Sequence, residues 1–313
     1  MNELALHFFT KRGISSEIDT NEYILEAAKT IELTHDIVTN LVRNNIDRLQ
    51  YEPVWSILHD MYLKCHEFTS GSLTSFLVAH ISSAEALCRT AIESAVNLQY
   101  ASYGDDVGNV IAYFRLYLAT ERDQNKSWLK SVEKSNGPNE EKEYHRDCIR
   151  KKYENLDVCE NALRESFSIM GIDFDSRRGS WPSIFDRFCK INKEIDYRTI
   201  YAALCSQAHN DPEDILNNLM SRIIQIDGIE ENGYAQAVEI EQYFFSLNMV
   251  LTAISFYVEA TAMYLAKYNI PVSKNIIPIL IKTKDLIIDL QTNSKSRIAN
   301  PVRLAIQASL TKE

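Results

Sequence analysis

Residues 243–266 read YFFSLNMVLTAISFYVEATAMYLA, and the choice between a soluble helical bundle and a membrane protein rests on this stretch. Glu259 is its only charged residue, over a length that could cross a bilayer as a helix. Polar residues such as Asn248 interrupt it, however, and it is preceded by Glu239 and Glu241 rather than by a basic cluster. We therefore predict the buried central helix of a bundle; a membrane-associated helix is the less favoured alternative.

The rest of the chain is also patterned as helices. It has 313 residues, of which 45% are hydrophobic and 24% charged, with only 9 Gly and 7 Pro, too few for a turn-rich β fold. Apolar residues recur every three to four positions in most segments. Helices are expected from about residue 20 to 46, from Pro53 to a Gly-Ser turn at 69–72, and over about 73–102, 106–133, 140–169, 195–211, 212–226, 234–268 and 276–290, with a weaker one from about 300.

The sequence thus predicts an all-α, multi-helix bundle. We divide it into an N-terminal helical extension (1–70), a helical core (71–268) and a C-terminal helical tail (269–313). Between the 140–169 helix and the 195–211 helix lies a connection without periodicity. In this connection, Ser180 is a suitable N-cap for a short helix, and Pro182 suits the first turn of that helix. Trp181 is expected to pack in the core.

Composition and missing motifs exclude several functions. The net charge of −10 disfavours a protein that coats nucleic acid. The six Cys form no C-x-x-C pair, which suits a reducing compartment, and the cytoplasm is the expected location. A single Glu-x-x-His, Glu32 to His35, is too little for a di-metal carboxylate site. Nucleotide- and zinc-binding motifs are absent, so we expect no cofactor and no metal.

The strongest candidate residues lie in YRTIYAALCSQAHNDP, residues 197–212. Tyr201 shares a helix face with Tyr197, whereas Ser206 and His209 are neighbours at i, i+3. His209 falls in the last turn before the break at Pro212, where the helix dipole favours the protonated imidazole. It is therefore either a cap or core residue, or a general acid or base.

A second candidate group lies on the earlier helix. Glu85, Arg89 and Glu93 follow one another at i, i+4 along the edge of its apolar stripe. They form either an exposed ion-pair ladder or a charged cluster that faces a pocket. Arg177 and Arg178, on the loop before the short helix, and Arg187, within that helix, could add contacts to an anion or to RNA.

Two motifs of this chain resemble those of a widespread uncharacterised bacterial helical family. They are Arg89-x-x-x-Glu93 and, about a hundred residues later, Tyr201-x-x-x-x-Ser206-x-x-His209. That family is similar to the HEPN superfamily of helical bundles, many of which are RNases of toxin–antitoxin and phage-defence systems. The resemblance covers about residues 70–265. It implies a HEPN-like core, an RNA substrate and a homodimer, because HEPN RNases usually pair an Arg and a His across a dimer.

HEPN ribonucleases carry that Arg and His four to six residues apart on one helix. Here the nearest upstream arginine is Arg198, with ten residues between it and His209, so we assign the cation's role to Arg89. The expected activity is metal-independent RNA cleavage, in which His209 transfers a proton, Arg89 offsets phosphate charge and Glu93 orients Arg89. The alternative is a non-catalytic module in which these side chains form a buried polar network and which binds a partner protein or a small ligand as a sensor or regulatory subunit.

Overall fold

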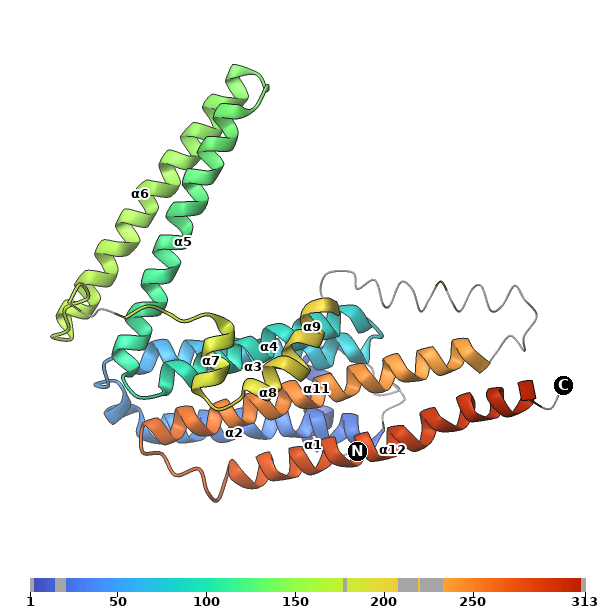
Figure 1. The fold of residues 1–313 in the computed structure, drawn as a ribbon. Helices are drawn as coiled ribbons and strands as arrows, with labels where there is room; N and C mark the ends of the chain where they lie inside the picture. The colour runs from blue at the N-terminus through green and yellow to red at the C-terminus, as the bar shows by residue number, and fades with distance from the viewer. Residues whose placement is uncertain (1–2, 15–20, 177–178, 208–218, 220–232, 311–313) are drawn as a thin grey trace.

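The computed structural model describes residues 3–14, 21–176, 179–207, 219 and 233–310. These residues form an all-α multi-helix bundle without strands, as the sequence predicts. Its long helices are α2 (Glu22–Leu49), α3 (Trp55–Leu77), α4 (Ile81–Ser102), α11 (Gly233–Lys267) and α12 (Ile277–Leu310). Figure 1 shows them side by side, with α1 (Glu3–Lys11) across α2 at one end.

Helix α11 lies at the centre of the bundle. It packs against α2, α3, α4 and α12, so other helices cover it on several sides. Its section Ile240–Lys267 is long and apolar enough to cross a membrane, but 83% of its most apolar window is buried inside the bundle. Lys193 and Lys284 lie 3.1 and 3.8 Å from the carboxylate of Glu259, the one charge in the apolar stretch, at the edge of this helix.

Two expected boundaries are wrong. Residues 69–72 form no turn, because α3 runs through them and ends at Leu77. The hydroxyl groups of Thr69, Ser70 and Ser72 donate to backbone carbonyls three or four residues earlier in α3, which satisfies them within the helix. Gly71 faces α4, where a β-carbon would lie 3.6 Å from Leu87. The division at residue 70 therefore falls inside a helix.

The short helix α7 (Ile184–Lys190) also begins later than expected. Ser183, not Ser180, caps it, since the Ser183 hydroxyl accepts from the Asp186 amide at 3.2 Å. Trp181 is buried, as predicted, against Tyr100 and Tyr113. The segments expected from 276 and from 300 form the single helix α12. The helix expected over 212–226 lies outside the described residues.

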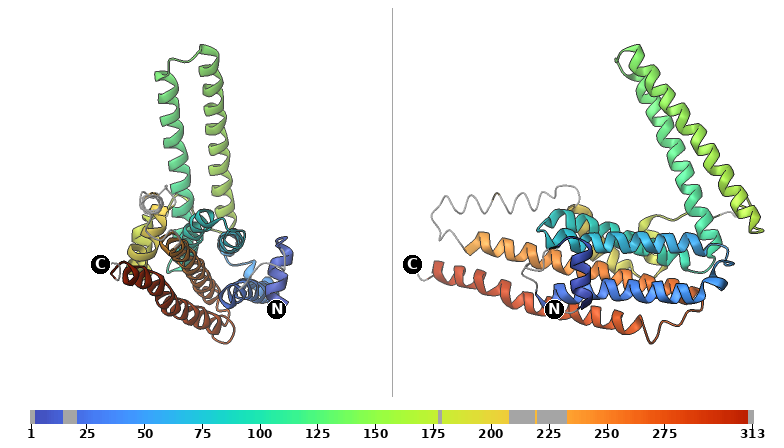
Figure 2. Two further views of the ribbon diagram at one scale, coloured as in Figure 1. Left: turned by 90° about the vertical axis from the view of Figure 1, so that its right-hand side faces the viewer. Right: turned by 180° about the vertical axis from the view of Figure 1, so that it is seen from behind.

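Helices α5 (Asp106–Lys134) and α6 (Asn139–Ile169) form an arm that projects from one end of the bundle (Figures 1 and 2). Buried residues recur every seven positions on both helices: Leu118, Asn125 and Val132 on α5, and Ile149 and Leu156 on α6. This spacing is typical of an antiparallel coiled coil. The buried amide of Asn125 occupies a seam position, where a polar side chain favours one register over others.

Histidine and tyrosine rings fill the interface between α2, α3 and α11. The rings of His35 and His66 stack with centroids 4.1 Å apart. His35 Nδ1 lies 3.0 Å from the Tyr62 hydroxyl, which lies 3.0 Å from that of Tyr257. Burial lowers the pKa of His35 and His59, and it lowers the pKa of His66 to about 3. These imidazoles are therefore neutral in the folded protein near pH 7.

This burial predicts a loss of stability in acid. Unfolded His66 takes up a proton near pH 6.5, whereas folded His66 does so only near pH 3, so the unfolded state binds more protons in this window. The free energy of unfolding should therefore fall as the pH drops from about 6.5 toward 3. In urea titrations at several pH values, His66→Gln should reduce the slope of the unfolding free energy against pH by about 1 kcal/mol per pH unit. Equal slopes for both proteins would contradict the assignment.

Candidate functional site

One face of α4 carries a polar side chain every four residues: Glu85, Arg89, Glu93 and Asn97. This spacing brings all four to the same side of the helix. The two carboxylates do not form the exposed ladder that the sequence also allowed. Glu85 is buried and accepts a hydrogen bond from Ser246 of α11. Glu93 accepts one, at 2.7 Å, from the hydroxyl of Tyr201.

Tyr201 reaches α4 from a π-helical turn. Within the helix expected over 195–211, the described residues run continuously as α8 (Glu194–Asp196), the π segment η1 (Tyr197–Tyr201) and α9 (Ala202–Gln207); residues 208–211 lie outside the described residues. The Ala202 amide donates to the Tyr197 carbonyl, five residues back. The Tyr197 and Tyr201 rings stack with centroids 5.4 Å apart, and Phe188 packs on Tyr201. Such π turns often occur at functional sites.

Two arginines flank the Glu93–Tyr201 pair. The guanidinium of Arg89 lies over the Tyr201 ring, 5.6 Å from its centroid. Arg187, on α7, is only 7% exposed; it donates to the Asn97 side chain and lies 5.2 Å from the centre of the Trp181 ring. We call Arg89, Glu93, Asn97, Arg187 and Tyr201 the α4 cluster.

The charges of the α4 cluster follow from its surroundings. Burial raises the pKa of the Tyr201 hydroxyl, and so does the carboxylate of Glu93, so Tyr201 stays protonated and donates. Burial lowers the pKa of the Arg187 guanidinium, whereas Glu93 acts in the opposite direction. Because an arginine starts from a very high pKa, Arg187 remains charged. The cluster therefore contains two cations, Arg89 and Arg187, and one carboxylate, Glu93.

The structure thus brings together four of the residues selected from sequence: Arg89, Glu93, Tyr201 and Arg187. Ser206 lies on α9, but its side chain is outside the described residues, as are His209, Arg177 and Arg178. Sequence reasoning missed Asn97. Its position, four residues after Glu93, continues the run that begins at Glu85, and extending the run by one step would have found it.

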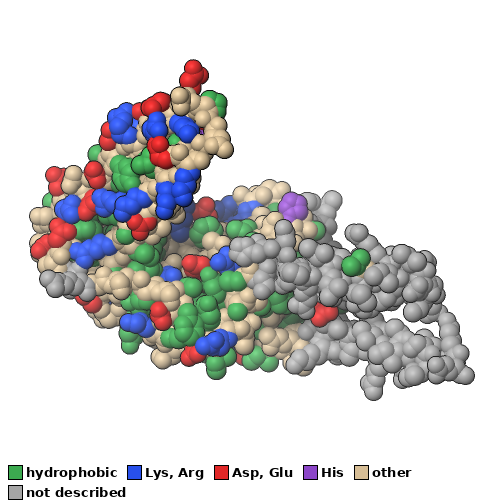
Figure 3. Space-filling model, turned by 45° about the horizontal axis from the view of Figure 1, so that its top comes forward, with side chains coloured by type: hydrophobic (Ala, Val, Ile, Leu, Met, Phe, Trp, Pro, Cys, Tyr) green, Lys and Arg blue, Asp and Glu red, His purple; other side chains and the backbone are tan. Residues whose placement is uncertain are grey.

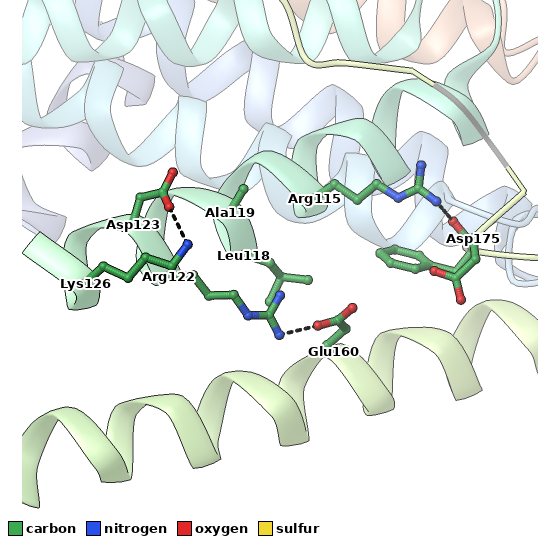
Figure 4. Close-up of a pocket in the computed structure, with 9 residues that line it drawn as sticks. Arg115, Leu118, Ala119, Arg122, Asp123, Lys126, Glu160 and Asp175 are labelled. Carbon is green, nitrogen blue, oxygen red and sulfur yellow. Dashed lines mark hydrogen bonds and ion pairs between the residues drawn. The ribbon is translucent and has the colours of Figure 1, made fainter.

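Glu32 and a cavity on the arm also gather charged groups among the described residues. Among the described residues, no group of three His, Cys, Asp or Glu could hold a metal. The carboxylate of Glu32, from the Glu-x-x-His element, accepts a hydrogen bond from the Arg12 guanidinium at 2.9 Å. A cavity of about 280 Å³ at the base of the arm contains several cations, but these are paired: Figure 4 shows Arg122 against Glu160 and Lys126 against Asp123.

Because Asn97 accepts a hydrogen bond from buried Arg187, we expect removal of the Asn97 side chain to destabilise the protein. Asn97→Ala leaves a guanidinium group in the interior without its side-chain acceptor, which should lower the free energy of unfolding by about 1–3 kcal/mol. Asn161→Ala, at an exposed position of α6, is the matched control and should change it by less than about 0.5 kcal/mol. Urea denaturation measures both, and equal effects would contradict the contact.

Comparison with known proteins places the chain in a family without giving a function. No curated protein and no solved structure matches it. Residues 56–223, just over half of the chain, match a protein family of unknown function, DUF5677. The matched range includes the arm and both stretches that carry the candidate residues, Arg89 to Glu93 and Tyr201 to His209. The chain therefore belongs to this family of unknown function.

Proposed function

We propose that the protein is a metal-independent endoribonuclease whose catalytic centre is the α4 cluster together with Ser206 and His209. One observation carries this proposal: Arg89 lies over the ring of Tyr201 and Arg187 is buried within electrostatic reach of Glu93, so two cations from different helices converge on the hydrogen-bonded Glu93–Tyr201 pair. The chain has a net charge of −10, so a local excess of cations is not a by-product of its composition. Guanidinium groups are suited to phosphate because their fixed N–H donors match its oxygens.

Each residue of the proposed catalytic centre has its own role in the reaction. His209 follows the last described residue of α9 by two positions and acts as the general base toward the ribose 2′-hydroxyl or as the acid toward the leaving oxygen. Arg89 and Arg187 offset the negative charge that grows on the phosphate. Glu93 orients Arg89, and Tyr201 and Ser206 position the substrate. Attack by the 2′-oxygen leaves a cyclic phosphate on one fragment and a 5′-hydroxyl on the other. Such an enzyme fits toxin–antitoxin or phage defence.

A second candidate function is favoured by the bonds within the cluster. The Tyr201–Glu93 bond and the Arg187–Asn97 bond both tie α4 to the segment 184–201, and neither side chain pair needs a ligand. In this alternative the cluster is a structural network in a non-catalytic module that binds a partner. The two functions differ in the effect expected of His209→Ala: activity is lost at unchanged stability in the nuclease, whereas stability falls in the binding module.

The test is cleavage of mixed cellular RNA by the purified full chain in the presence of a chelator. Wild type should cut RNA and leave cyclic-phosphate ends. Arg89→Ala and His209→Ala should each slow cleavage by about 100-fold or more, the usual contribution of acid–base and charge-stabilising groups. Melting temperature is measured alongside and should stay near that of wild type for His209→Ala.

Arg198→Ala is the matched control, because Arg198 lies in the same π segment but pairs at the surface with Glu194 at 3.0 Å. It should cleave like wild type. Intact RNA after incubation with wild type, or toxicity on expression that survives His209→Ala, contradicts the nuclease. A clear fall in the melting temperature of His209→Ala with no RNA cleavage by any variant supports the binding module.

A further inference from the structure

Another cavity, which we call the α5–α7 cavity, lies where the arm joins the bundle and has a volume of about 380 Å³. It is enclosed by the first two turns of α5, the segment that precedes α7, and the C-terminal ends of α4 and α7. Three of its lining residues, Gly108, Ala112 and Gly179, are small, which keeps the space open. Its volume falls within the range of small-molecule sites in proteins, roughly 300–1,000 Å³.

Tyr100 lines this cavity with a hydroxyl group that has no partner in the protein. The residue is only 7% exposed, yet its hydroxyl forms no hydrogen bond with any described residue. Buried tyrosine hydroxyls usually find a partner, as Tyr62 does on Tyr257. The Tyr100 ring is held edge-on against Trp181, with 5.0 Å between the ring centroids. The hydroxyl is therefore fixed in place and available to a molecule that enters the cavity.

Three further groups of the lining can also form additional hydrogen bonds. Lys190 Nζ lies 5.9 Å from the centre of the Tyr100 ring and pairs with no carboxylate among the described residues. The cations of the neighbouring arm, by contrast, lie among Asp and Glu, as Figure 3 shows. The Ser180 hydroxyl likewise has no partner in the described part of the chain. The Asn109 amide nitrogen donates to the Tyr100 and Tyr103 carbonyls at 3.0 and 2.8 Å, which fixes this side chain and leaves its oxygen as an acceptor.

The chemistry of these groups selects a class of ligand. Lys190, Tyr100 and Ser180 offer donors from three separate segments, and one of the three is charged. A phosphate monoester matches them, because it presents three acceptor oxygens and between one and two negative charges. A phosphodiester or a carboxylate presents only two such oxygens. The Asn109 oxygen and the carboxylate of Asp105, which also caps α5, accept from hydroxyl groups on the rest of the ligand.

We infer that the α5–α7 cavity is a binding site for a sugar phosphate, that is, a phosphate monoester on a carbon skeleton that carries hydroxyl groups. Lys190, Tyr100 and Ser180 bind the phosphate, and Asn109 binds the skeleton. The site lies next to the α4 cluster, because the ring of Trp181 contacts Tyr100 and also the Arg187 guanidinium. It does not depend on the function proposed for that cluster.

Isothermal titration calorimetry of the full chain with ribose 5-phosphate tests the site. Wild type should bind one molecule per chain, and inorganic phosphate and ribose should each bind about tenfold more weakly or less, because each makes only part of the contacts. Tyr100→Phe and Lys190→Gln should each weaken binding of ribose 5-phosphate by about tenfold or more, since each removes a hydrogen bond to a charged group. Tyr100→Phe should leave the melting temperature of the ligand-free protein unchanged, because the hydroxyl has no partner among the described residues.

The matched controls are Tyr103→Phe, at a side chain that is 58% exposed outside the cavity, and Lys130→Gln, at an exposed position of the arm. Both should bind ribose 5-phosphate like wild type. A 2′-O-methyl RNA trinucleotide with hydroxyl ends carries only phosphodiesters and should not displace ribose 5-phosphate. The proposal is overturned if wild type binds no ribose 5-phosphate up to about 10 mM, if Tyr100→Phe binds it as tightly as wild type, or if the trinucleotide displaces it.

Discussion

Burial of the apolar surface of α11 is the constraint on which the rest of the structure depends. Residues Leu247 to Leu265 of this helix are almost all buried, and helices from four other parts of the chain are needed to cover them. Burying side chains of this size contributes roughly 1.5–3 kcal/mol each. The polar groups that this helix carries inside therefore need partners on its neighbours, and Tyr257 and Ser246 find them on Tyr62 and Glu85.

The α4 cluster is a consequence of the same packing. Helix α4 buries one face against α3 and α11 and leaves its line of polar residues at the edge, where α7, η1 and α9 lie against it. The polar side chains of that line contact three different elements: Glu85 contacts α11, Arg89 and Glu93 contact η1, and Asn97 contacts α7. The Glu93 carboxylate is held by the hydroxyl of Tyr201, which donates to it from a segment 108 residues away in sequence. Charges at such a site are worth more than at the surface, because water screens them less.

Much of the fold was predictable because helical periodicity is strong here. The arm helices, α11 and the burial of Trp181 follow from apolar spacing and turn residues alone. The errors have physical causes. Thr69, Ser70, Gly71 and Ser72 have the composition of a turn, but hydroxyls that bond within their own helix allow α3 to continue. The π turn at Tyr197–Tyr201 leaves no mark in the spacing, because it depends on how Tyr201 packs against Phe188 and α4.

The candidate site was predictable in part for the same reason. Arg89, Glu93 and Tyr201 share a cluster, as their positions on helix faces suggested, whereas the burial of Arg187 and its bond to Asn97 depend on tertiary contacts between α7 and α4. The HEPN-like relationship stays a prediction. The structure adds that the polar face of α4 is held by specific bonds from other helices.

A double-mutant cycle between Glu93 and Tyr201 tests that claim most directly. Unfolding free energies of wild type, Glu93→Gln, Tyr201→Phe and the double variant give the coupling energy between the two side chains. A hydrogen bond from a hydroxyl to a partly buried carboxylate predicts a coupling of about 1.5–3 kcal/mol. A coupling indistinguishable from zero would mean that Tyr201 does not hold Glu93 and that the α4 cluster is not assembled as described.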